Sequence, residues 1–169
     1  IYVQAAAATP TVLTKALAER ASELRNVELC HLHTEGEAAY ANPELAASFH
    51  VNSFFIGKNV RHTIAAGNGS YTPVFLSELP NLFRKGALTL DVVFIHVSPP
   101  DSHGYCSLGV SVEATLAAIE NSKIVIAQVN PQMPRTFGDA MIHIEKIDYT
   151  VDVDAPIFGH HTPEITETE

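Results

Sequence analysis

Two long apolar runs place the strongest limit on what this chain can fold into. Residues 92–97 read VVFIHV and residues 124–129 read IVIAQV, and neither run alternates strictly with polar side chains. Such runs are typical of strands that are buried on both faces of a parallel sheet. Between them, Ser111 can cap a helix over residues 111–121. A strand, a helix and a second strand in this order predict one βαβ crossover.

The rest of the chain continues this alternation of strands and helices. We expect strands at residues 2–3, 27–31 and 49–56, and helices at residues 10–25, 59–66 and 74–84. Residues 141–153 are rich in β-branched side chains and predict a strand or a hairpin at an edge of the sheet. Residues 67–73 and 98–110 predict loops. The pattern predicts fold class α/β, with a largely parallel sheet flanked by helices.

Composition narrows the class of protein. The 169 residues are 46% hydrophobic and 17% charged, which fits one domain with a substantial core. The formal net charge of -9 argues against nucleic acid or an anionic membrane surface as a partner, because phosphate groups would be repelled. No apolar run reaches the roughly 20 residues of a membrane span. Cys30 and Cys106 have no zinc or redox spacing, which favours a reducing compartment and predicts a cytoplasmic protein.

Both ends of the sequence predict a piece of a longer protein. The chain opens at Ile1 inside a strand-like segment, and near its end Thr162 and Pro163 have the pattern of a helix start. That helix would barely begin before the sequence stops.

Polar loops follow both apolar runs, and ligands of open α/β sheets collect outside the carboxyl ends of the strands. In the first loop Pro99 and Pro100 stiffen the chain, while Gly104 and Gly109 let the backbone approach a ligand. The side chains that can act on protons there are Asp101 and His103. The alternative is that the prolines and glycines only turn the chain and that Asp101 caps a turn.

The second loop, residues 130–136, offers different chemistry. Asn130 and Gln132 supply amide donors and acceptors, and Arg135 supplies a planar fork that suits a carboxylate or a phosphate. The alternative is a structural Arg135 that binds loop carbonyl groups.

Two further segments carry weaker signals. Residues 67–73, GNGSYTP, resemble a phosphate-binding turn but lack the lysine and the spacing of a P-loop, so a plain turn is favoured. His31 and His33, with Glu35 or Glu37, suggest a metal site, but there is no HExxH motif and no cysteine partner, so we expect no metal. His96 and His143 lie in apolar segments and predict hydrogen-bonded core residues.

Five blocks of the sequence resemble the amino-terminal domain of the acetyl-CoA hydrolase/transferase family, which includes 4-hydroxybutyrate and butyrate–acetate CoA-transferases. They span nearly the whole chain in the family's order. The blocks are AAAATPTVLTKAL (5–17), NSFFIGKNVRHTIAAG (52–67), YTPVFLSELPNLF (71–83), SPPDSHGYCSLGVSVEAT (98–115) and IVIAQVNPQMPRTFGDAMIHI (124–144).

The resemblance implies a NagB/RpiA/CoA-transferase-like domain over residues 1–157, with residues 158–169 as a polar tail or linker to a missing carboxyl-terminal domain. It also implies an enzyme of acetate metabolism that moves CoA between a short-chain acyl-CoA and a carboxylate such as acetate, butyrate or 4-hydroxybutyrate. The reaction would pass through a glutamyl-CoA intermediate whose glutamate lies outside this chain, so no catalytic residue is assigned here. Coenzyme A would be a substrate, no cofactor is expected, and the family suggests a homodimer or larger homo-oligomer.

In this scheme the chain supplies one wall of the pocket, and the fragment alone is inactive. The residues that we expect to contact substrate are Gly67, Asn68, Tyr71, Pro100, Asp101, His103, Gly104, Tyr105, Asn130, Gln132, Met133, Arg135 and Thr136. One departure from the family's text is Gly67-Asn68-Gly69-Ser70, where many relatives read Gly-Arg-x-Asp. Two alternatives stay open: an acetyl-CoA hydrolase, and a non-catalytic ligand-binding or regulatory domain.

Overall fold

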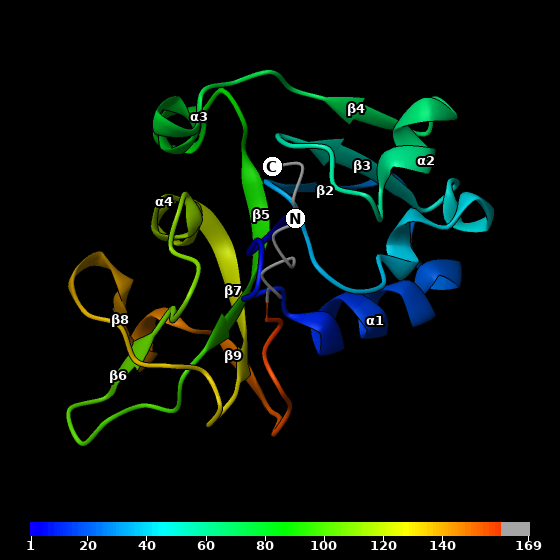
Figure 1. Cartoon of the computed structure of the whole chain (residues 1–169). Coiled ribbons are helices and arrows are strands. Elements are labelled where there is room, and N and C mark those ends of the chain that lie inside the picture. The colour runs from blue at the N-terminus through cyan, green and yellow to red at the C-terminus, as the bar shows by residue number, and fades with distance from the viewer. Residues whose placement is uncertain (160–169) are drawn as a thin grey trace, which may run out of the picture.

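The computed structural model describes residues 1–159, and these form one seven-stranded sheet and one two-stranded ribbon. The strand order in the large sheet is β4-β3-β2-β1-β5-β7-β9, and each neighbouring pair is parallel (Figure 1). The strands are β1 Tyr2–Val3, β2 Val27–His31, β3 Phe49–Ser53, β4 Gly69–Tyr71, β5 Leu90–Val97, β7 Ser122–Val129 and β9 Tyr149–Asp152. The expected α/β class with a largely parallel sheet is confirmed.

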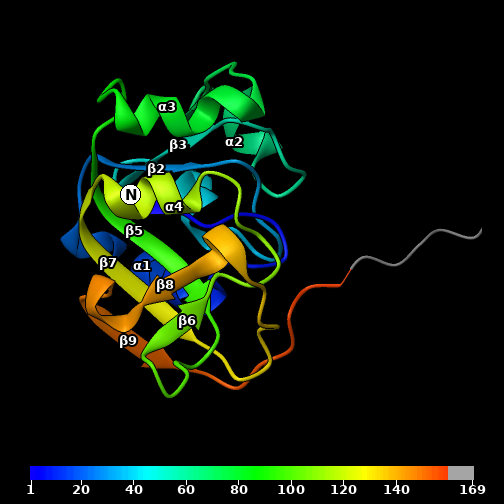
Figure 2. The same ribbon diagram turned by 90° about the vertical axis from the view of Figure 1, so that its left-hand side faces the viewer.

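Helices cover both faces of the sheet. Figures 1 and 2 show α3 and α4 on one face and α1 and α2 on the other. The helices are α1 Thr11–Glu19, α2 Arg61–Ala65, α3 Leu79–Arg84 and α4 Thr115–Glu120. Single 3-10 turns lie at η1 Ala21–Glu23, η2 Ala39–Ala41, η3 Pro43–Leu45, η4 Leu76–Glu78, η5 Gly138–Ala140 and η6 Ile144–Lys146.

The central strands are apolar because both of their faces are buried. In β5, Val93 and Ile95 belong to the core beneath α3 and α4, whereas Val92 and Phe94 belong to the core beneath α1. Successive side chains of a strand point to opposite faces, so a strand between two cores needs an apolar residue at each position. The paired run in β7 follows the same rule, since Val125 lies in one core and Ile126 packs on the other.

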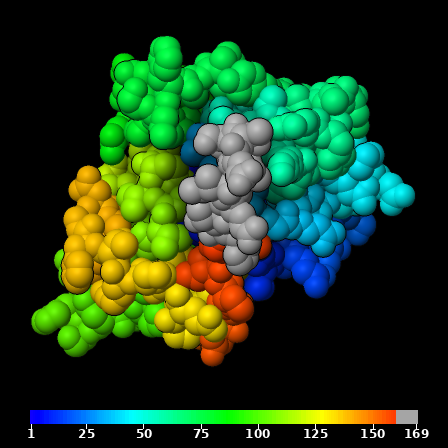
Figure 3. Space-filling view, viewed as in Figure 1, coloured from blue at the N-terminus to red at the C-terminus, as the bar shows by residue number. Residues whose placement is uncertain are grey.

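A short antiparallel ribbon lies outside the large sheet. It consists of β6 Tyr105–Ser107 and β8 Met141–His143, and it crosses in front of β7 in Figure 2. The loop between β5 and β6 projects from the body of the molecule, green at the lower left of Figure 3. This ribbon ties the segment after β5 to the segment that precedes β9.

Three expectations about strands were wrong. Residues 141–153 do not form one strand or a self-paired hairpin, because β8 pairs with β6, but the expected place at an edge of the sheet is confirmed by β9, which pairs with β7. The loop 98–110 contains β6, and the turn 67–73 contains β4, an edge strand beside β3. Each of these short strands is stabilised by a distant partner, which local sequence does not show.

The helices are shorter than expected. The helix between β5 and β7 begins at Thr115, because the Ser111 hydroxyl bonds the Glu113 carboxylate and does not cap a helix. The segment 74–84 is helical only from η4 onward, with Pro80 in the first turn of α3, where a missing N–H costs nothing. Phe75, which lies before η4, is 81% exposed.

No helix within residues 1–159 is both long enough and apolar enough to cross a membrane. The helix start expected at Thr162 lies outside the described residues.

Candidate functional site

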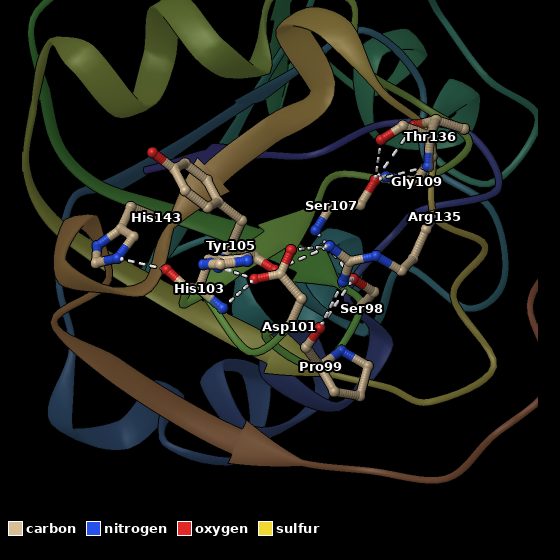
Figure 4. Close-up of polar contacts among 10 residues, drawn as sticks. All are labelled: Ser98, Pro99, Asp101, His103, Tyr105, Ser107, Gly109, Arg135, Thr136 and His143. Atoms are coloured by element: carbon tan, nitrogen blue, oxygen red, sulfur yellow. Dashed lines mark hydrogen bonds and ion pairs between the residues drawn. The ribbon is translucent and has the colours of Figure 1, made fainter.

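The carboxyl ends of β5, β7 and β9 lie side by side because the three strands are parallel neighbours. Two loops leave this edge, residues 98–104 and residues 130–136, and hydrogen bonds join them (Figure 4). The sequence-based expectation that these two loops meet at one end of the sheet is therefore confirmed.

Arg135 fastens the second loop to the first. Its Nη1 donates to the Ser98 hydroxyl at 3.0 Å and to the Pro99 carbonyl at 2.9 Å. Its Nη2 donates to Asp101 Oδ2 at 3.1 Å and to the Tyr105 carbonyl at 3.0 Å. Both ends of the guanidinium group thus bond other groups of the protein. This is the structural role that the sequence left open as the alternative to substrate binding.

Asp101 organises the turn that carries the exposed tip. Its Oδ1 accepts hydrogen bonds from the backbone N–H groups of His103 and Tyr105, each at 2.9 Å. The bond from Tyr105 is the main reason why the pKa of this carboxyl lies below its usual value, and Arg135 adds to the effect. Asp101 is therefore a carboxylate that caps a turn, as the alternative reading proposed, and it is not poised to donate a proton.

Ser107 joins the two loops from beneath, a role that the sequence did not predict. Its hydroxyl donates to the Thr136 carbonyl and accepts from the Thr136 N–H, both at 2.9 Å. Thr136 in turn donates its hydroxyl to the Gly109 carbonyl at 2.8 Å. Ser107 is completely buried in a β-strand, where a hydroxyl has many possible partners, so no sequence pattern marks it.

Two glycines have positive φ and permit close packing between loops. A Cβ on Gly109, whose φ is 67°, would collide with the buried side chain of Met133. A Cβ on Gly104, whose φ is 81°, would lie 2.6 Å from His143 Nε2. The close approach that glycine allows is therefore to neighbouring side chains of this chain.

The tip of the first loop rests on the antiparallel ribbon. The rings of Tyr105 and His143 pack edge to face, with their centroids 5.1 Å apart. His143 Nε2 lies 3.1 Å from the His103 carbonyl oxygen (Figure 4). His143 is partly exposed, so its expected place in the core was wrong, whereas His96 is buried as expected.

Surface hollows flank the two loops. One, of ≈ 500 Å³, is lined by Pro99, Pro100, Val129, Pro131, Asp152, Val153 and Asp154. Beside it, the Gln132 amide donates to Asp154 Oδ1 at 2.6 Å. The two aspartates disfavour an anionic ligand inside this hollow.

A second hollow, of ≈ 450 Å³, follows β2 and β3 and was not anticipated. It is lined by His33, Thr34, Glu35, Gly36, Gly57, Lys58 and Asn59. Glu35 lies 4.0 Å from His33 Nε2. His31 faces inward to the Tyr40 hydroxyl at 3.2 Å, and burial lowers its pKa to about 4. Within residues 1–159 no cluster of three His, Cys, Asp or Glu side chains could hold a metal ion.

The structure does not bring the third expected segment to the other two. Three strands lie between β4 and β5, and Gly67 and Asn68 precede β4, at the opposite end of the strand from its carboxyl end. Tyr71 does lie at a carboxyl end, but on the far edge of the sheet. Within one chain three strands therefore separate these residues from the loops that Arg135 joins.

Comparison with known proteins identifies the family. The model of the acetyl-CoA hydrolase/transferase N-terminal domain matches residues 1–158. The chain belongs to this family.

Curated relatives of the acetyl-CoA hydrolase/transferase domain are CoA-transferases. The chain is 45% identical over 149 residues to the succinyl-CoA:acetate/propanoyl-CoA:succinate CoA transferase of Fasciola hepatica, covering 87% of this chain and 31% of the relative. It is 38% identical over 160 residues to the 4-hydroxybutyrate coenzyme A transferase of Clostridium kluyveri, covering 95% of this chain and 37% of the relative. The chain thus spans about a third of the length of these relatives.

Solved structures show the same domain. RipA from Yersinia pestis superposes with a TM-score of 0.91 at 28% identity, covering 98% of this chain and 41% of RipA. The 4-hydroxybutyrate CoA-transferase of Porphyromonas gingivalis superposes with a TM-score of 0.78 at 34% identity, covering 93% of this chain and 35% of that protein. The NagB/RpiA/CoA-transferase-like fold implied by the resemblance agrees with these neighbours.

Proposed function

We propose that this chain is the amino-terminal domain of a CoA-transferase that exchanges CoA between a short-chain acyl-CoA and a carboxylate. The observation that carries the proposal is the family match over residues 1–158, supported by 45% identity to a CoA transferase. Acetate, butyrate or 4-hydroxybutyrate is the class of acceptor, since relatives of this domain carry these names.

The chemistry would use a glutamate of the carboxyl-terminal domain. Its carboxylate attacks the thioester carbonyl and releases the CoA thiolate, leaving an acyl–glutamyl anhydride. The thiolate then attacks the glutamyl carbonyl and releases the acyl group as a carboxylate, which leaves glutamyl-CoA for the acceptor carboxylate to open by the reverse steps. Covalent catalysis divides one acyl transfer into reversible steps of similar energy.

This chain would supply a rigid wall of the pocket rather than the nucleophile. Pro100, His103 and Tyr105 are exposed on the first loop, while Asn130 and Met133 are buried and hold the second loop in place. Direct contact with substrate therefore falls to the exposed tip and to Gln132, with Arg135, Asp101 and Thr136 fixing its shape. The hollow around His33 and Lys58 lies at the same carboxyl edge and is a second candidate wall.

The remaining parts of the proposal concern the whole protein. Residues 1–157 form the domain and residues 158–169 lead to a carboxyl-terminal domain, which fits a chain one third as long as its relatives. The protein would be a cytoplasmic homo-oligomer, with coenzyme A as substrate and no cofactor.

A hydrolase is the second candidate, because the family's description includes acetyl-CoA hydrolases. The two activities differ only in whether water or a carboxylate opens glutamyl-CoA. Thiol release from acetyl-CoA should therefore be compared with and without added carboxylate.

The deciding experiment incubates the intact protein that contains this domain with acyl-CoA and acetate. We expect acyl exchange and a glutamyl-CoA adduct, detected by its mass, on a residue outside this chain. Absence of both the adduct and the exchange would contradict the proposal, and would favour a non-catalytic domain. Residues 1–169 alone should show no turnover, and turnover by that fragment would place the nucleophile within it.

A further inference from the structure

Four buried polar side chains form a row beneath the two loops. Gln4 follows β1, His96 lies in β5, Gln128 lies in β7 and Asn130 follows β7; their exposed fractions are 0%, 4%, 1% and 0%. We call these four residues the polar row. Buried polar groups persist in a core only when hydrogen bonds offset their loss of water, so the partners of each member indicate what the row does.

Backbone partners fix the orientation of two of its amides. Gln128 Oε1 accepts from the Val12 N–H at 3.0 Å, at the start of α1. Asn130 Oδ1 accepts from the Gln132 N–H at 3.0 Å, and its Nδ2 donates to the Ala155 carbonyl at 2.8 Å. In each side chain the oxygen is therefore assigned by an N–H donor, and the NH2 group is the one that faces His96.

These two NH2 groups determine the tautomer of His96. Asn130 Nδ2 lies 3.1 Å and Gln128 Nε2 lies 3.4 Å from His96 Nε2. A ring nitrogen that faces two donors must accept, so His96 is neutral, with its proton on Nδ1. Nδ1 has no partner of full hydrogen-bond geometry among residues 1–159. The backbone of Thr9 interacts with the ring and raises its pKa, but this effect is smaller than that of burial. Burial lowers the pKa of this histidine to about 4, which agrees with a neutral ring.

Asn130 is the first residue of the loop that ends in Arg135 and Thr136. Its N–H donates to the Val97 carbonyl at 2.9 Å, and its own carbonyl accepts from the Met133 N–H at 3.0 Å. The side chain that His96 holds thus sets the first turn of residues 130–133. From that turn the loop continues to Arg135, whose side chain bonds Ser98 and Asp101.

We propose that His96 is a positioning residue: its unprotonated Nε2 fixes Asn130, and through it the loop 130–136. An apolar residue would fill the same space, but it would leave the buried Gln128 NH2 group without an acceptor and the Asn130 NH2 group with the Ala155 carbonyl alone. Gln4 supports the histidine from the other side, since its Oε1 accepts from the His96 N–H at 2.6 Å. The consequence for catalysis rests on the proposed function, whereas the consequence for loop order does not.

A matched pair of variants of the intact protein separates this role from simple core packing. His96→Leu removes the acceptor, while His96→Gln can place Oε1 where Nε2 stood. We expect His96→Leu to speed amide hydrogen exchange in peptides covering residues 130–136 by at least about tenfold, and His96→Gln to restore most of the protection. Leu79→Ala, a core truncation in α3, is the control, because it destabilises the fold without touching the polar row.

The outcomes decide the proposal. Faster exchange confined to residues 130–136 and to the partner segment at Ala155 supports it, as does a matching fall in kcat/KM that His96→Gln reverses. Unchanged amide exchange in His96→Leu overturns the proposal. So does an equal loss of protection in the two His96 variants, and so does the same exchange pattern in Leu79→Ala. If the intact protein has no CoA-transferase activity, the exchange data still decide the role of His96.

A second measurement needs no variant, and so it remains decisive if His96→Leu does not fold. Nitrogen-15 NMR of histidine-labelled protein should show an unprotonated Nε2 for His96 at pH 7. A proton on Nε2, or a charged ring, would overturn the proposal.

Discussion

Two sets of polar contacts hold the same pair of loops, and they differ chiefly in burial. The fork of Arg135 and its partner Asp101 lie at the surface, with side chains 33% and 35% exposed. The polar row lies a few residues inward, and its members are at most 4% exposed. Distances are alike in the two sets, 2.9–3.1 Å for Arg135 and 2.6–3.4 Å for the contacts of His96.

Burial changes what each bond is worth. Water replaces a broken bond at the surface, so exposed ion pairs contribute little to the free energy of unfolding. A buried donor or acceptor that loses its partner is left unsatisfied, at a cost of about 1–3 kcal/mol. The comparison therefore places the rigidity of the two loops in the strand ends beneath them, and not in the ion pair that the sequence makes conspicuous.

Acid should produce the largest difference between the two sets. Burial lowers the pKa of His96, in the polar row, to about 4, and it does the same for His31, which lies outside both sets. An unfolded histidine titrates near 6.5. The stabilisation from each neutral ring is complete above about pH 6.5 and is lost as the pH falls toward 4, by about 3 kcal/mol for each residue.

The exposed set should respond in a different window. The pKa of Asp101 lies below its usual 3.8, so its contribution persists until the pH falls below that value. Urea unfolding at pH 7, 5.5 and 4.5 covers the range in which the histidines titrate, above the usual pKa of Asp101. A free energy of unfolding that stays constant across these three values would contradict the burial of both rings.

Gln4→Leu should give the next largest effect. It leaves the His96 N–H without its acceptor and removes the amide donor to the Leu108 and Ser111 carbonyls. We expect a loss of about 3 kcal/mol in the free energy of unfolding, measured by urea denaturation. Gln132→Leu is the matched surface change, and it should cost about 0.5 kcal/mol or less. Equal losses in the two variants would break the comparison.

The sequence predicted the part of the fold that depends on local pattern. The runs in β5 and β7 are apolar because each strand separates two cores, and this pattern is visible without a structure. Because those two strands had to be parallel neighbours, their following loops had to meet. The sequence could therefore locate Asp101 and Arg135 at one edge of the sheet.

Partners distant in the chain were not predictable. Gln4 and Gln128 are single amides within apolar segments, and nothing local shows that both face His96 or its backbone. The three-residue strands β4 and β6 exist only because β3 and β8 lie beside them. Backbone groups decide much of the roles of Asp101 and Arg135, through the His103 and Tyr105 N–H groups and the Pro99 and Tyr105 carbonyls, and such groups carry no side-chain signature.

Arg135→Lys tests the exposed set directly. Lysine can keep an ion pair with Asp101, but it cannot reproduce a fork that reaches Ser98, Pro99 and Tyr105. We expect a loss of about 1 kcal/mol in the free energy of unfolding, with faster proteolysis in residues 99–105. The control is Arg84→Lys at the exposed pair with Glu120. This variant should change neither the free energy of unfolding nor the rate of proteolysis in residues 99–105. A loss as large as that of Gln4→Leu would show that the fork, and not the polar row, holds the loops.

The smallest effect should come from the shortest ion pair. Lys123 Nζ lies 2.6 Å from Asp91 Oδ1 near the amino ends of β5 and β7, and both side chains are 77% exposed. Because water and salt screen such a pair, Lys123→Ala should leave the melting temperature unchanged in 0.15 M salt. The Gln128–His96 contact is longer, 3.4 Å, but it is buried, so burial and not distance ranks the two. A clear fall in the melting temperature of Lys123→Ala would mean that distance outweighs burial in this protein, and the comparison would then fail at its simplest point.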